Sequence, residues 1–91
     1  MPVVRFKQGD AVLIEWEDSY GCSSSWQDLP DGGEPETMVC RSLGWVSRLS
    51  KRSVVIVPHI GHNERMGVKQ GCGDMTIPIA AIVRARKIKA P

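Results

Sequence analysis

Long apolar runs are absent from this sequence. No stretch approaches the ~20 consecutive apolar residues that a membrane-spanning helix requires. The opening residues MPVVRFKQGD do not follow the order of a signal peptide, which is charged, then apolar, then small. We therefore expect a soluble, cytoplasmic protein without a membrane partner.

Cysteine and histidine are scarce as well. The three cysteines, Cys22, Cys40 and Cys72, are odd in number and form no C-x-x-C motif, so no disulfide framework is indicated. The histidines supply one H-x-x-H pair, His59 and His62, whereas a zinc site needs about four converging ligands. We expect free thiols in a reducing compartment, no metal site and no cofactor.

No arrangement of residues typical of an enzyme is present. Cys72 and His62 are the nearest approach to a nucleophile and its base, but the sequence offers no third group to orient the histidine and no oxyanion hole. The serines at 23–25 form a run of turn residues. DGGEP is acidic and GCGD leads into a strand, so neither fits a phosphate-binding loop. We expect no catalytic residues and no enzymatic activity.

What the sequence does contain is a series of short β-strand patterns. In DAVLIEWED, the apolar residues Val12, Ile14 and Trp16 alternate with Glu15 and Glu17, as in a half-buried strand. Similar patterns predict five strands in all, at 10–18, 41–50, 53–60, 74–78 and 83–89.

Glycine and proline punctuate these strands. Gly44 has no side chain to pack and predicts a bulge or a sharp bend in the second strand. The glycine-rich stretch 61–74 has no period and predicts a mobile loop. Pro78 ends the fourth strand, and the spacing of Ile77 and Ile82 then predicts one tight helical turn.

This order of elements predicts an all-β fold, a small five-stranded SH3-like barrel that occupies residues 1–91 as one domain. A long loop at 19–37 joins strands one and two, and the single helical turn precedes the last strand. An OB-fold is the close alternative, but it would need a real helix where the chain is glycine-rich. The predicted core consists of Val12, Ile14, Leu43, Val55, Val57, Ile77 and Ile82, with Trp16 mostly buried.

The long loop holds two aromatic residues, Tyr20 and Trp26, in a polar setting. A tryptophan left in water forfeits a large area of favourable burial, so we expect the Trp26 ring to fold back onto the barrel as a staple. Cys22 and Cys40, at the two ends of the loop, are expected to lie close together as free thiols. The alternative is a docking surface at Tyr20 and Trp26, because such residues anchor peptides.

Several short segments carry a resemblance to a known group of proteins. The segments are WEDS at 16–19, Trp26 in its serine-rich loop, GW at 44–45 and IPIAAIV at 77–83. Over roughly residues 12–88 they resemble small, uncharacterised proteins carried by phages, prophages and integron-type mobile gene cassettes. The resemblance implies an SH3-like barrel and an accessory-gene setting, and it brings no assigned activity or functional residues.

Charge is distributed unevenly along the chain. Residues 1–38 contain eight acids and two bases, net −6, whereas residues 39–91 contain ten bases and two acids, net +8. Such asymmetry either exposes a basic face to nucleic acid or lets the two halves neutralise each other within one domain. Because the net charge is only +2, we favour neutralisation.

The basic residues form two groups that a small barrel would bring near each other. The first is Arg48, Lys51 and Arg52 at the second hairpin, and the second is Arg84, Arg86, Lys87 and Lys89 on the last strand. A joint patch would bind nucleic acid through counterion release. Stacking aromatics are missing apart from Trp45, which is itself a candidate core residue. The competing interpretation is a solvated edge strand whose charge discourages aggregation.

A non-enzymatic binding or adaptor module is the function we expect first. Edge strands and a long loop are natural docking surfaces for a protein segment. Tyr20, Trp26 and Trp45 are the candidate partner-binding residues. The partner would be another protein or a second copy of the chain, since the acidic half of one copy complements the basic half of another. A nucleic-acid-binding protein is the alternative.

Overall fold

The computed structural model describes residues 5–19, 24–26, 28–29 and 34–89. Within them the protein is all-β, as predicted. The strands are β1 (Ala11–Asp18), β2 (Met38–Leu49), β3 (Ser53–Val57), β4 (His59–Asn63), β5 (Val68–Cys72), β6 (Met75–Pro78) and β7 (Ile82–Lys87). The predicted helical turn is the 3₁₀ turn η1 (Ile79–Ala81), directly before β7. No helix in the described part of the chain is long and apolar enough to cross a membrane.

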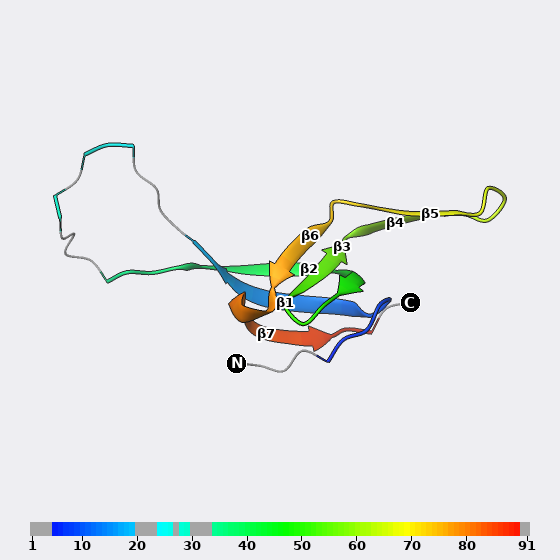
Figure 1. Ribbon diagram of the computed structural model, residues 1–91, viewed down its shortest axis with the longest axis horizontal. Helices are drawn as coiled ribbons and strands as arrows, with labels where there is room; N and C mark the ends of the chain where they lie inside the picture. The colour runs from blue at the N-terminus through cyan, green and yellow to red at the C-terminus, as the bar shows by residue number, and fades with distance from the viewer. Residues whose placement is uncertain (1–4, 20–23, 27, 30–33, 90–91) are drawn as a thin grey trace.

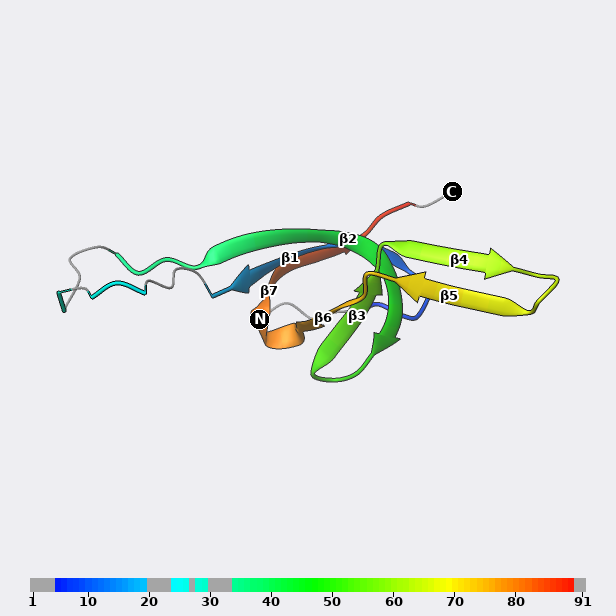
Figure 2. The ribbon, with the colours of Figure 1, turned by 90° about the horizontal axis from the view of Figure 1, so that it is seen from above.

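Five strands form one antiparallel sheet in the order β6-β3-β2-β1-β7. β2 pairs with β1 along its first part and with β3 along its last part, and it curves strongly between the two (Figure 2). The register irregularity of β2 lies between Val46 and Arg48 rather than at Gly44, which pairs regularly with Val12. A Cβ at position 44 would stand 2.8 Å from the carbonyl oxygen of Val57. The absence of a side chain therefore lets β2 approach the end of β3 closely.

The main sheet is not closed. β6 and β7 are its two edges, and no ladder joins them within the described residues. The closed SH3-like barrel predicted from the sequence is therefore not confirmed. The structure shows a curved five-stranded sheet wrapped around one core (Figure 2).

A second, two-stranded sheet stands where the sequence predicted a mobile loop at 61–74. β4 and β5 pair along their whole lengths. Their turn is held by the Asn63 side chain, which accepts a hydrogen bond from the Met66 backbone N–H at 3.1 Å, and by Gly67 at φ 66°. The loop prediction was wrong because nearly every residue of this hairpin is exposed, so burial imposed no apolar alternation on its sequence.

The core lies on the inner face of the main sheet. It consists of Val12, Ile14, Val46, Val54, Ile56, Ile77 and Ile82. Val55 and Val57 are also buried, on the other face of β3, so six of the seven residues predicted as core are buried. Trp16 packs against this core, and its Nε1 donates a hydrogen bond to Ser42 Oγ at 3.0 Å. The prediction for Leu43 was wrong: its side chain is 58% exposed because it pairs with Leu13 on the face opposite Val12.

The molecule is elongated because two segments project from the main sheet in opposite directions (Figure 1). Its principal extents are 61 × 29 × 23 Å and its radius of gyration is 17.2 Å, whereas a compact chain of this length has a radius of gyration of roughly 12 Å. One projection is the β4–β5 hairpin. The other is the connection between β1 and β2, residues 19–37, which we call the acidic arm and of which residues 19, 24–26, 28–29 and 34–37 are described.

Candidate functional site

The outer face of β1 and β2, opposite the core, carries apolar side chains at one end. Leu13 pairs with Leu43 on this face, and Ala11 pairs with Trp45. The backbone N–H of Ile88, just after β7, donates to the Ala11 carbonyl at 2.8 Å. Leu43 is 58% exposed and Ile88 is 36% exposed. Apolar groups from three separate segments therefore meet at the end of the ladder where β1 begins.

A hollow of about 300 Å³ opens among these residues. Its wall includes Leu43 and Trp45 from β2, Pro58 from the β3–β4 junction, and Ile88 and Lys89 from the segment after β7. We call these five residues the Trp45 surface. The volume is at the lower limit of small-molecule sites, about 300–1,000 Å³, and suits one or two side chains of a docked peptide.

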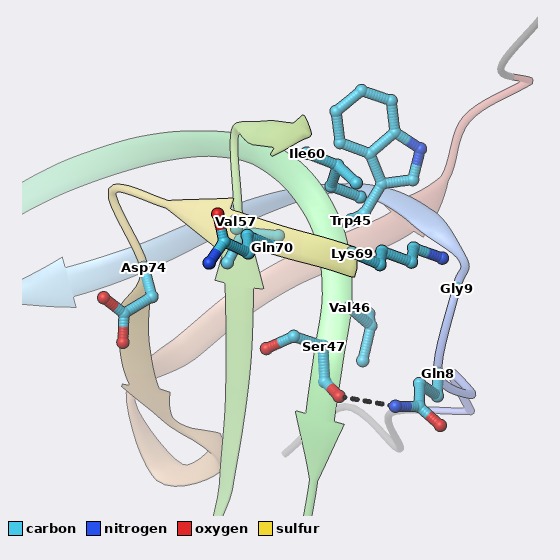
Figure 3. A pocket seen from close by; sticks show the side chains of 11 residues that line it. Gln8, Gly9, Trp45, Val46, Ser47, Val57, Ile60, Lys69, Gln70 and Asp74 are labelled. Carbon is cyan, nitrogen blue, oxygen red and sulfur yellow. Dashed lines mark hydrogen bonds between the residues drawn. The ribbon is translucent and has the colours of Figure 1, made fainter. Parts of the chain in front are cut away.

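A wider groove of about 720 Å³ lies between the main sheet and the β4–β5 hairpin, and Trp45 borders it too (Figure 3). Trp45 and Ile60 stand side by side at one end of this groove. The Gln8 amide at its margin donates a hydrogen bond to a β2 backbone carbonyl at 3.1 Å. The charged groups in the lining are Lys69 and Asp74, so the groove favours neither sign of ligand charge.

Three arginines surround one carboxylate farther along the same outer face. Glu15 lies between Arg41 on β2 and Arg84 on β7, and Arg86 is the next outward residue of β7. Arg84 Nη2 donates to Glu15 Oε2 at 2.9 Å, with the Arg84 side chain 71% exposed and the Glu15 side chain 15% exposed. We call Arg41, Arg84 and Arg86 the arginine cluster. Three arginines around Glu15 make this part of the face positive, and the next outward acid, Glu17, lies farther along β1 opposite Val39.

The arginines shift the titration of Glu15. The hydrogen bond from Arg84 is the largest cause and lowers the pKa of the carboxyl below its ordinary value of 4.5, partial burial acts in the opposite direction, and the positive charges of the cluster lower it further. The same hydrogen bond raises the pKa of Arg84. Glu15 therefore stays ionised at neutral pH and partly neutralises the cluster.

The residues predicted to bind nucleic acid are distributed over two places in the sheet. They are Arg48, Lys51 and Arg52 around the β2–β3 turn, and Arg84, Arg86, Lys87 and Lys89 on and after β7. β1 and β2 separate β7 from β3 in the sheet order. Two of the β7 cations already face acids of the first half, Arg84 with Glu15 at 2.9 Å and Lys87 with Asp10 at 3.8 Å. Charge neutralisation between the two halves is thus present at these pairs.

The three residues predicted to bind a partner have different outcomes. Trp45 lies at the site, Trp26 lies in the acidic arm, and Tyr20 falls outside the described residues. Trp26 is 102% exposed, so the predicted staple was wrong. Its large apolar neighbour in the described part of the arm, Leu29, is itself 86% exposed. Ordering a long polar segment to bury one ring costs more backbone entropy than the burial returns.

The cysteines and histidines are dispersed. Cys40 and Cys72 carry free thiols, and Cys22, predicted to lie near Cys40, falls outside the described residues. Cys72 pairs across the β4–β5 hairpin with His59 rather than with His62. The described part of the chain holds no group of three or more His, Cys, Asp or Glu residues that could hold a metal ion. The absence of enzymatic activity and of a cofactor stays a prediction.

The sequence interpretation missed Arg41 and assigned Leu43 to the core. The signal that would have corrected both is parity, since alternate residues of a strand share a face. Arg41, Leu43 and Trp45 share one parity, and a charged, exposed Arg41 places all three on the outer face. Val46, whose parity is opposite, is the buried residue of this strand.

Comparisons with known proteins return no match: no protein-family model, no curated protein and no solved structure is similar to this chain. The resemblance to proteins of phages and integron cassettes therefore stays a prediction from the quoted segments.

Proposed function

We propose that this protein is a non-enzymatic binding module of SH3-like architecture that docks a protein segment on the Trp45 surface. One observation carries the proposal: Leu43 and Trp45 of β2 and Ile88 after β7 converge on one hollow, yet Leu43 and Ile88 remain exposed. Apolar area left in water is worth about 25 cal/mol per Å² on burial. Grouped exposed apolar side chains rimmed by charge are typical of interaction sites.

The order of the elements supports the SH3-like architecture. The main sheet is a meander of β1, β2, β3 and β6, and β7 returns beside β1. The helical turn η1 stands before that last strand, and β2 bends so that it serves both ladders. The β4–β5 hairpin is then an insertion between the third and fourth strands of a barrel that β6 and β7 leave open.

The charge of the face defines the partner's chemistry. The apolar hollow ends at Lys89, and the arginine cluster follows along the same outer face. A fitting peptide carries a bulky apolar side chain for the hollow and carboxylates a few residues away for the arginines. A basic peptide would bring its own positive charges against the arginine cluster, so basic peptides are disfavoured.

Selection from a displayed library of random peptides tests the proposal. We expect the full chain to enrich peptides in which a large apolar residue lies near Asp or Glu. Leu43→Ser should weaken their binding roughly tenfold or more, because a Leu that becomes buried on docking contributes about 1.5–3 kcal/mol. Met66→Ser is the matched control, since Met66 is 71% exposed but lies in the β4–β5 turn.

Two results would contradict the proposal. One is peptide binding that Leu43→Ser leaves unchanged. The other is binding of a mixed-sequence oligonucleotide that falls steeply with salt and on Arg84→Glu but survives Leu43→Ser. That second pattern would assign the arginine cluster to nucleic acid and favour the alternative function.

A further inference from the structure

We propose that the partner of the Trp45 surface is the acidic arm of a second copy of this chain. In this arrangement Trp26 and Leu29 of one copy enter the hollow of the other, and the arm's carboxylates face the arginine cluster. The inference rests on the proposed function and names the occupant of the same site.

The arm has the composition of a docking segment. Trp26 and Leu29 are 102% and 86% exposed and stand three residues apart, with Asp28 between them. A tryptophan carries about 150–250 Å² of burial area and is enriched at the centres of protein interfaces. The arm therefore holds two large apolar side chains that the isolated chain leaves in water.

The charges of the arm and the face are complementary. Between Asp18 and Arg41 the sequence contains four acids, Asp28, Asp31, Glu34 and Glu36, and no lysine or arginine. The face presents the arginine cluster around Glu15, with Lys89 at the hollow, and the next outward acid of β1, Glu17, lies nearer the base of the arm. The apolar residues precede most of the arm's acids, just as the hollow precedes the arginine cluster along the outer face. The arm's acids can therefore reach the arginine cluster while Trp26 and Leu29 occupy the hollow.

The position of the arm favours a second copy over its own face. The arm leaves β1 at Asp18 and enters β2 at Met38, whereas Trp45 pairs with Ala11 at the other end of the same ladder. Seven residues of strand separate the two ends, about 23 Å at ~3.3 Å per residue. The described residues of the arm extend away from the sheet rather than back along it (Figure 1).

A two-fold arrangement satisfies both copies at once. If two elongated molecules lie antiparallel with the bases of their arms adjacent, each arm can run along the outer face of the other, from the arginine cluster to the Trp45 surface. Each copy then contributes one arm and one face, which is the self-complementary pattern of a closed dimer. The arm-to-face contact would occur twice in the dimer, so two individually weak contacts would together stabilise it.

Sedimentation equilibrium of the full chain over a wide concentration range tests the inference. We expect a monomer–dimer equilibrium that Trp26→Ser weakens about tenfold or more and that Leu43→Ser with Ile88→Ser weakens similarly. Met66→Ser, an exposed apolar residue outside both the arm and the face, should leave it unchanged. All of these side chains are exposed, so the variants should keep the circular dichroism of the parent.

Mixing and charge reversal separate arm-to-face contact from any other dimer. We call Trp26→Ser the arm variant and Leu43→Ser with Ile88→Ser the face variant. An equimolar mixture of the two retains one intact arm and one intact face. The mixture should therefore form a heterodimer at concentrations where each variant alone is monomeric. Arg84→Glu with Arg86→Glu should weaken dimerisation, and adding Glu34→Lys with Glu36→Lys should restore it.

Three results would overturn the inference. The first is a monomer at every concentration alongside intact binding of selected peptides, which would leave the proposed function standing with a different partner. The second is a dimer indifferent to both sets of variants. The third is a concentration-independent blue shift of Trp26 fluorescence that the face variant abolishes, since this would show the arm docked on its own chain.

Discussion

At the scale of the residue, Glu15 controls how positive the outer face is. Its carboxylate accepts a hydrogen bond from Arg84 and lies in the field of Arg41 and Arg86. Because the pKa of Glu15 is lower in the folded state, the ion pair stabilises the fold above pH 4.5 and this contribution is lost as the pH falls towards the folded-state value. Glu15 therefore competes with any acidic ligand for the same arginines.

Glu15→Gln should tighten the binding of acidic peptides to the face severalfold, because it removes the competing carboxylate. Peptide titrations at neutral pH check this. The variant should also lose less stability than the parent between neutral pH and a pH below 4.5 in denaturation experiments. Unchanged or weaker peptide binding by Glu15→Gln, with the fold intact, would contradict a contact between the arginine cluster and the ligand.

Gly44 lets the backbone of β2 approach the end of β3 closely. A Cβ at position 44 would lie 2.8 Å from the Val57 carbonyl oxygen, and backbone atoms cannot move aside as a flexible side chain can. Gly44→Ala should therefore cost about 1–3 kcal/mol of unfolding free energy, as overpacking does. Gly61→Ala is the control, because its nearest neighbour is at 4.0 Å. Equal urea midpoints for the two variants would contradict the close approach.

At the scale of the element, the two sheets differ in what holds them together. The main sheet packs a shared core, whereas β4 and β5 bury almost nothing. A two-stranded hairpin without such packing is marginally stable in water. Backbone amides of β4 and β5 should therefore exchange with deuterium far faster than those of β1 and β2. Comparable protection of the hairpin in the dilute monomer would indicate contacts that the structure does not contain.

The same difference explains which elements the sequence could predict. β1 and β3 show the patterns of buried strands. Val12 and Ile14 of β1 lie in the core with Val54 and Ile56 of β3, and Val55 and Val57 on the other face of β3 are buried as well. β4 and β5 have no such pattern because hydrogen bonding and a turn, rather than burial, define them. The Trp45 surface could not be predicted, since it requires the register that brings Ile88 beside Ala11 and Trp45.

The Trp26 prediction failed for a related reason. Burial of a tryptophan is favourable only if the chain that carries it can be ordered at lower cost. Trp26 lies among serines and acids, and the ladder that ends at Asp18 and Met38 does not constrain it. In the proposed dimer the ring would enter a hollow that the register of β1 and β2 has already formed on the second molecule.

At the scale of the whole molecule, the acidic arm leaves one end of the β1–β2 ladder and the Trp45 surface lies at the other end. In the proposed dimer, each copy supplies the surface that the arm of the other copy contacts. The charge asymmetry of the sequence then has two roles. Within one copy it forms the pairs of Glu15 with Arg84 and of Asp10 with Lys87. Between copies, the acids of the arm remain available for the arginines that Glu15 does not neutralise.

The most direct test is an NMR titration in which only the face can respond. The Trp26→Ser chain is labelled with ¹⁵N and receives the unlabelled chain carrying Leu43→Ser and Ile88→Ser, so a contact can form only between the labelled face and the unlabelled arm. We predict shifts of the Trp45 indole and of the backbone amides of Leu43 and Ile88, with the β4–β5 turn unaffected. Unchanged spectra at these three residues, or shifts confined to the β4–β5 hairpin, would contradict docking on the Trp45 surface.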